Sequence, residues 1–124
     1  MSVTRNAYWR SRKGVHFENL ARQWLCRQGL EVLHSNYHCK CGEIDLVMGD
    51  AATLVFVEVR YRSSHLFGGP LATVTVAKQQ RLRNTARHFL MMHPQYQQAP
   101  CRFDVIGISG RDQHGFNWIR NAFY

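Results

Sequence analysis

The chain has 124 residues, of which 16 are Lys or Arg and 8 are Asp or Glu, so its formal net charge is +8 with the histidines neutral. This length suits one domain of the usual ~100–150 residues, and a hydrophobic share of 45% excludes a disordered basic tail. No apolar run reaches the ~18 residues of a membrane span, and residues 1–13 lack the apolar stretch of a signal peptide. We therefore expect a cytoplasmic protein. The four unevenly spaced cysteines agree with a reducing compartment.

The two signs of charge are distributed differently along the chain. Arginine supplies 13 of the 16 cations, and its planar guanidinium suits phosphate, so the first partner to expect is an anionic polymer. Four of the eight acids fall within one stretch of 16 residues: Glu43, Asp45, Asp50 and Glu58. This stretch is the place to look for chemistry.

The sequence predicts a flexible basic arm over residues 1–13, followed by a single domain over 14–124. Apolar residues recur at helical spacing from Val15 to Gln28, and Gly29 supplies a natural helix end. Residues 30–37 are predicted to form a first strand.

A hairpin is predicted next. Polar and apolar residues alternate over 42–48 and again over 53–60, which indicates two antiparallel strands joined by the four residues 49–52. With a loop of this length, simple counting places Glu43 opposite Glu58.

The C-terminal half begins with loop signals over 63–70. A second helix is expected to start at Thr73 or Thr75 as its cap and to run to about His93, and residues 101–109 form a further strand.

The order of these elements is helix, three strands, helix, strand. It predicts an α/β fold with a central mixed β-sheet flanked by helices, in which the last strand returns parallel to a hairpin strand through a crossover. The apolar tail over 116–123 is expected to dock on this body.

The hairpin gathers acids on one face. Residues two apart on a strand point the same way, so Glu43, Asp45, Glu58 and Arg60 share a face. Adjacent carboxylates repel one another unless a cation or a proton lies among them. A hard ion such as Mg²⁺ takes one or two carboxylates together with water and substrate phosphate, and it can activate that water. The pattern favours a metal-dependent phosphodiesterase, although Glu43 could also be a solvated strand residue.

Several motifs follow one another along the chain. They are Gly42–Leu46, Phe56–Arg62, Lys78 at a helix start, Arg102–Val105 and the tail Trp118–Phe123. Together they resemble the YraN-type family of small bacterial proteins, over nearly the whole chain from about Val15. That family is similar in turn to the restriction-endonuclease-like superfamily, whose nucleases include Holliday junction resolvases. The resemblance implies a restriction-endonuclease-like core.

The superfamily pattern also implies site residues. It combines an acid on the first helix, an Asp on the first hairpin strand and an acid-x-Lys on the second, which here are Glu18, Asp45 and Glu58 with Arg60. Asp45 and Glu58 would hold Mg²⁺ or Mn²⁺, with Glu18 assisting. Arginine at position 60 can hold phosphate but is a poor proton shuttle, and Lys78, in the first turn of the second helix, is the candidate to replace the lysine.

Basic side chains near this site are candidates to bind nucleic acid, with DNA expected first. They are Arg62, Arg81, Arg83 and Arg87. Those on the second helix form either this contact or a solvated face.

Some residues admit a plainer interpretation. Glu18 lies four positions before Arg22, which suits an ordinary helical ion pair. Asp104 is either a site residue or the partner of Arg102 or Arg87.

A cluster of possible zinc ligands comprises His34, His38, Cys39 and Cys41. The Cys-x-Cys spacing is too short for a zinc finger and no second ligand pair follows, so a loop without metal is favoured.

Three functions remain in view from the sequence. The first is a nucleic-acid-binding protein with a Mg²⁺-dependent nuclease site. The second is a non-catalytic nucleic-acid-binding module with the same fold, which Arg60 favours. The third is a protein-interaction domain whose charge serves solubility.

Overall fold

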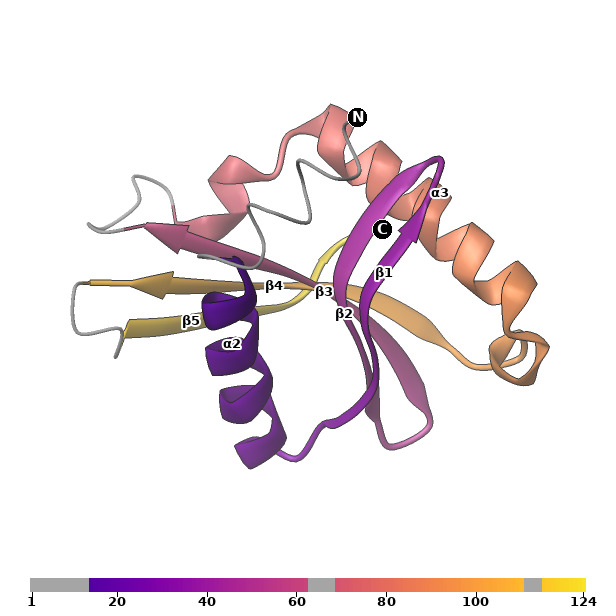
Figure 1. The fold of residues 1–124 in the computed structure, drawn as a ribbon, viewed down its shortest axis with the longest axis horizontal. Coiled ribbons are helices and arrows are strands. Elements are labelled where there is room, and N and C mark those ends of the chain that lie inside the picture. Colours follow the sequence, from indigo (N-terminus) through magenta and orange to yellow (C-terminus); the bar gives the residue numbers. More distant parts are fainter. Residues whose placement is uncertain (1–13, 63–68, 111–114) are drawn as a thin grey trace.

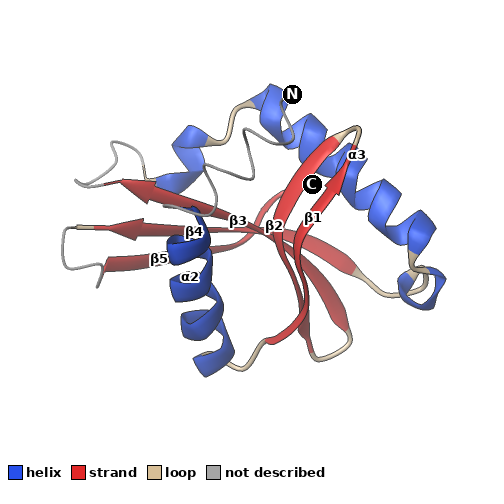
Figure 2. Cartoon of the chain, in the orientation of Figure 1, coloured by secondary structure: helices blue, strands red, loops and turns tan. Residues whose placement is uncertain are grey.

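A computed structural model describes residues 14–62, 69–110 and 115–124, and the predicted N-terminal arm lies outside them. Figures 1 and 2 show the elements. In chain order they are α2 (Val15–Arg27), β1 (Glu31–Cys39), β2 (Gly42–Asp50), β3 (Thr53–Arg62), η2 (Pro70–Thr73), α3 (Val76–Met92), η3 (Pro94–Tyr96), β4 (Cys101–Ser109) and β5 (Gly115–Phe123). Neither α-helix in this part of the chain has the length and hydrophobicity of a membrane span.

The strands form one mixed sheet in the order β1-β2-β3-β4-β5. β4 runs parallel to β3 and the other neighbours are antiparallel. This confirms the predicted α/β class and the parallel return after the second helix. The tail was expected only to dock, but it forms the fifth strand, β5, against β4.

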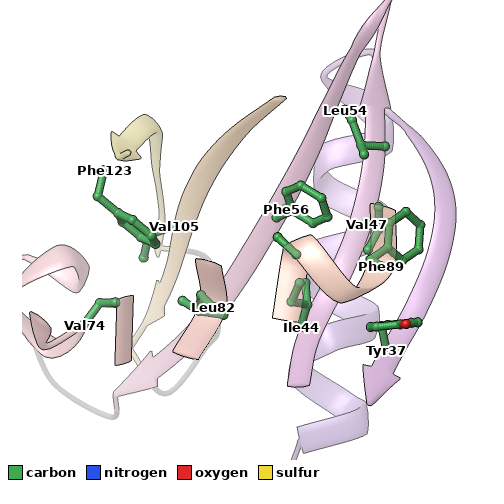
Figure 3. Close-up of a cluster of buried hydrophobic side chains, with 11 residues drawn as sticks. Tyr37, Ile44, Val47, Leu54, Phe56, Val74, Leu82, Phe89, Val105 and Phe123 are labelled. Atoms are coloured by element: carbon green, nitrogen blue, oxygen red, sulfur yellow. The ribbon is translucent and has the colours of Figure 1, made fainter. Parts of the chain in front are cut away.

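The two helices cover opposite faces of the sheet (Figure 1). Under α2 lies one buried cluster, built from Phe17, Ala21, Leu25, Leu30, Leu46, Met48, Val55, Val57, Ile106 and Ile108. Under α3 lies the other, most of which is drawn in Figure 3 and which includes Tyr37, Ile44, Val47, Leu54, Phe56, Leu82, Ala86 and Phe89. Each fully buried Val, Leu, Ile, Phe or Met side chain contributes about 1.5–3 kcal/mol of transfer free energy. Both clusters therefore stabilise the packing of a helix on the sheet.

The helix boundaries follow from local chemistry. At the end of α2 the amide of Gly29 donates to the Cys26 carbonyl and that of Leu30 donates to the Leu25 carbonyl, while Gly29 takes a φ of +104° that glycine adopts without strain. At the start of α3 the Thr75 hydroxyl accepts from the amide of Lys78 at 3.1 Å. Of the two predicted caps, Thr75 is therefore the one that the helix uses.

The predicted register of the β2–β3 hairpin is wrong by two residues. Asp50 pairs with Thr53 and Met48 pairs with Val55, so the turn consists of Ala51 and Ala52 rather than the four residues 49–52. Ala51 takes a φ of +53°, as a tight two-residue turn requires. A shift of two keeps side chains on their own face, so the predicted division holds where the two strands pair. It fails at the start of β2, where the alternation breaks: Ile44 packs with Val47 under α3, whereas Leu46 lies under α2.

Candidate active site

Asp45 and Glu58 meet where the β2–β3 ladder ends. The last paired residues are Leu46 and Val57, and beyond them the Asp45 Oδ2 atom accepts a hydrogen bond of 2.8 Å from the amide of Val59. Glu58 is 4% exposed, and its side chain hydrogen-bonds to that of Asp45. Two hard oxygen donors from adjacent strands are thus brought into direct contact.

The environment of Glu58 favours its protonated form. Burial, followed by the neighbouring negative charge of Asp45, raises the pKa of Glu58 from its ordinary 4.5 to about 8, and the hydrogen bond with Asp45 acts in the same direction. The positive charges of Lys78 and Arg60 act in the opposite direction and only partly offset this. At neutral pH Glu58 therefore keeps its proton.

Two cations converge on one oxygen of Glu58. Arg60 Nη1 lies 3.2 Å from Glu58 Oε2, and Lys78 Nζ lies 3.7 Å from the same atom. Lys78 reaches this oxygen from the first turn of α3. It thus lies beside Glu58, as expected for a lysine that replaces the one missing at position 60. The candidate site therefore combines residues of β2, β3 and α3.

Arg60 is held in place by η2. Its Nε atom donates to Thr73 Oγ1 at 2.9 Å and its Nη2 atom donates to the Thr73 carbonyl at 2.6 Å. The Thr73 hydroxyl donates in turn to the Pro70 carbonyl at 2.7 Å. Pro70 sits on Gly107, which pairs with Arg60, and a Cβ at Gly107 would lie only 2.7 Å from the proline ring. Thr73 was predicted only as a possible helix cap, and Pro70 and Gly107 were not predicted as site residues, because no local pattern indicates a contact between segments so far apart.

Glu18 is buried, at 5% exposure, in the first turn of α2. Arg22, the partner that spacing alone suggested for Glu18, donates from Nη2 to Asn19 Oδ1 at 2.9 Å. Phe17 stacks on Tyr61 with 3.8 Å between ring centroids. The start of α2 therefore lies against the C-terminal end of β3, on the face of the sheet opposite to α3.

Glu43 does not face Glu58, which corrects the predicted pairing of these two residues. It pairs instead with His38 across β1 and β2, and 3.0 Å separates His38 Nε2 from Glu43 Oε2. The break in alternation between Ile44 and Leu46 turns Glu43 away from the α3 side of the sheet, where Glu58 contacts Lys78. The expected group of three carboxylates is thereby reduced to Asp45 and Glu58.

Asp104 belongs to a separate buried network on the other face. It is 1% exposed and accepts hydrogen bonds from Arg102 Nε at 3.0 Å, Trp118 Nε1 at 2.9 Å and the amide of Asn121 at 2.9 Å. Arg102 also reaches Asp50, with 3.0 Å between Nη2 and Oδ2. Of the alternatives for Asp104, the structure selects the pair with Arg102, which ties β4 to the β2–β3 turn and to β5.

The arginines expected to bind nucleic acid are placed differently from one another. On α3, Arg83 donates to the Tyr124 carbonyl and to Gln80, and Arg87 donates to Asn84 at 3.0 Å. Arg81 is exposed. Arg62 is the last residue of β3, and its side chain lies outside the described part of the structure.

The possible zinc ligands lie on β1 and in the turn that follows it. His34 packs its ring against Tyr37, and the Cys41 amide donates to Cys39 Sγ at 3.3 Å. Across residues 14–62, 69–110 and 115–124, no three or more His, Cys, Asp or Glu side chains form a group that could hold a metal ion.

Fold and site together define an α/β protein with a mixed five-stranded sheet and an acid pair, of which Glu58 is buried and Asp45 half-buried, beside two cations. The chain belongs to the uncharacterised protein family UPF0102, whose family model matches residues 17–108. This supports the family resemblance drawn from the motifs.

Relatives that carry the family name match nearly end to end. A UPF0102 protein of Alcanivorax borkumensis is 49% identical over 93% of this chain and 95% of its own length. One from Methylobacillus flagellatus is 54% identical over 89% of this chain and 95% of its own. One from Aeromonas hydrophila is 51% identical over 90% and 84%. The family is thus shared by chains of similar length.

Proposed function

We propose that this protein binds nucleic acid and hydrolyses phosphodiester bonds at a divalent-metal site formed by Asp45 and Glu58, on a restriction-endonuclease-like core. The observation that carries the proposal is the contact between these two carboxyl groups, next to Arg60 and Lys78, in a chain with a net charge of +8. Metal-dependent hydrolysis of a phosphodiester uses a hard-metal ligand set together with positive charge next to the phosphate.

The donor set fits Mg²⁺ or Mn²⁺. Hard divalent ions favour carboxylate oxygens, and two carboxylates leave other positions for water and substrate. When bound, such an ion supplies an activated water and neutralises charge on the phosphate. Glu58 would be ionised in that state, so the proton that it keeps at neutral pH would be released on binding.

The two cations have different parts in this proposal. Arg60 has Nε and Nη2 committed to Thr73 and Nη1 to Glu58, so it neutralises charge at a fixed position. Lys78 makes a longer contact of 3.7 Å at the end of a flexible side chain and is 26% exposed. Lys78 is therefore the residue free to follow the phosphate, with Glu18 supporting the site from α2.

Substitutions that keep shape and remove charge test the site. The Asp45→Asn and Glu58→Gln variants should lose Mg²⁺- or Mn²⁺-dependent cleavage of single-stranded, flapped and four-way-junction DNA, and of RNA, by at least about a hundredfold. Glu31→Gln, an exposed change on β1 with the same loss of charge, should cleave like the wild type. Cleavage by both site variants at the wild-type rate would refute the assignment.

A non-catalytic nucleic-acid-binding module is the second candidate, and the fixed Arg60–Glu58 pair favours it. An arginine that already neutralises Glu58 weakens the need for a metal ion at that carboxylate. Salt-dependent binding of DNA or RNA, without cleavage in Mg²⁺ or Mn²⁺ by the wild type, would select this function.

A further inference from the structure

The basic residues of α3 do not share one face. Successive residues of an α-helix are about 100° apart around its axis, so Arg81 lies about 60° from Lys78, while Arg83 and Arg87 lie about 140° and 180° away. A single nucleic-acid strand that meets Lys78 can therefore meet Arg81 but has Arg83 and Arg87 on other sides of the helix.

The contacts of the helix agree with this geometry. Arg83 reaches the C-terminus of the chain, where its Nη1 atom donates to the Tyr124 carbonyl. Arg87 donates to Asn84 on the same helix. Both guanidinium groups thus have part of their donor capacity committed within the chain. They lie away from the flank that carries Lys78.

The flank of Arg81 faces the β1–β2 turn, which Figure 1 shows beside α3. Gly42 makes this approach possible, because a Cβ there would lie 3.2 Å from Thr85 Oγ1 and 3.8 Å from Arg81 Cβ. Lys40 is exposed in the same turn, two residues before Gly42. Three cations, Lys78, Arg81 and Lys40, are therefore carried by two elements in contact.

Acidic groups do little to offset this charge. α3 contains no Asp or Glu from Val76 to Met92, and Glu43, at the start of β2, is paired with His38. The acidic group that Lys78 contacts is Glu58 of the candidate site itself. Positive charge thus extends from the acid pair along one flank of α3.

We infer that the backbone of the bound nucleic-acid strand runs from the Asp45–Glu58 pair along the flank of α3 formed by Lys78 and Arg81 to Lys40 in the β1–β2 turn. This inference rests on the proposed nucleic-acid binding and assigns the path of the strand. Arg81 and Lys40 each contact a phosphate, whereas Arg83 and Arg87 do not.

The test compares single-charge variants of the whole protein by fluorescence anisotropy with labelled single-stranded DNA and a four-way junction, from about 50 to about 200 mM salt. Arg81→Gln and Lys40→Gln should each weaken binding about three- to tenfold and lower the slope of log K against log salt by about one. Arg83→Gln and Arg87→Gln should stay within about twofold of the wild type. Arg27→Gln, an exposed change on α2 at the opposite face of the sheet, is the control for net charge.

The outcomes separate the inference from the function on which it rests. Equal losses in the Arg81, Arg83 and Arg87 variants, or wild-type affinity in Arg81→Gln, would overturn the assigned path while leaving nucleic-acid binding in place. Failure of the wild type to bind either probe at about 50 mM salt would overturn both. Thermal melting of each variant shows whether a loss of affinity comes from unfolding.

Discussion

The carboxylate of Asp45 accepts a hydrogen bond of 2.8 Å from the amide of Val59, just beyond the last paired residues of β2 and β3. A side chain thus continues the hydrogen bonding where the backbone pairing stops. It fixes one oxygen of Asp45, and the same side chain meets Glu58. The local geometry of the candidate site is therefore set by strand structure as well as by charge.

Two replacements of Asp45 should separate the effect of its hydrogen bond to Val59 from the effect of its negative charge. Asp45→Ala leaves the Val59 amide without its acceptor and should lower the free energy of unfolding by about 1–2 kcal/mol. Asp45→Asn keeps an acceptor oxygen and removes the charge beside Glu58, so it should be more stable than Asp45→Ala. Urea denaturation at neutral pH measures both, and equal stability of the two variants would contradict the role given to the hydrogen bond.

The raised pKa of Glu58 predicts a stability that falls as pH rises. Between its ordinary pKa of 4.5 and the folded value of about 8, the unfolded chain loses a proton that the folded chain keeps, so unfolding becomes easier across this range. Glu58→Gln removes the effect. In metal-free buffer the variant should gain about 1–3 kcal/mol on the wild type between pH 5 and pH 8. A difference between the two proteins that stays constant with pH would show that Glu58 titrates normally.

Thr73 should matter through Arg60. Thr73→Val removes the hydroxyl that accepts from Arg60 Nε and donates to the Pro70 carbonyl, and it should cost about 1 kcal/mol of unfolding free energy. Thr73→Ser keeps both hydrogen bonds and is the matched control. The ¹⁵Nε–¹H signal of Arg60 reports the contact directly, and it should lose its protection from solvent exchange only in the valine variant.

The network around Asp104 should be among the most sensitive parts of the fold. Asp104→Ala leaves the largely buried Arg102 guanidinium with Asp50 as its remaining acid, and a loss of about 3–5 kcal/mol is expected. Trp118→Phe removes one donor to Asp104 and should cost about 1–2 kcal/mol. Chemical denaturation ranks the two variants, and a larger loss in Trp118→Phe would reverse the order proposed here.

Much of the fold was predictable because its signals are local. The periodicity of α2, the glycine after it and the threonine cap of α3 each act within a few residues. The hairpin turn escaped prediction, since Ala51 and Ala52 carry none of the usual Asn-Gly or Asp-Gly signals for a two-residue turn. β5 escaped because its apolar residues do not alternate, and its pairing with β4 is irregular between Phe103 and Val105.

In the candidate site, too, some features follow from local sequence and others depend on contacts between distant segments. The shared face of Asp45 and Glu58 follows from strand parity, which the error of two residues preserved. The fixation of Arg60 by Thr73 depends instead on how η2 lies across Gly107, and such long-range approaches have no counterpart in local sequence. The exclusion of Glu43 from the acid pair had no local signal either, since it depends on a break in the alternation of β2 between Ile44 and Leu46.

The parallel pairing of β3 with β4 has a consequence for the order of assembly. β1, β2 and β3 are joined by short turns and pair with their neighbours in sequence. Leu54 of β3 pairs instead with Cys101 of β4, and the whole of α3 lies between these two residues in the chain. Contacts between distant residues form late because loop closure costs entropy first. We therefore expect the hairpin that carries both acids to form before Thr73 and Lys78 arrive. During folding, the two carboxyl groups would face water until the second half of the chain closes over them.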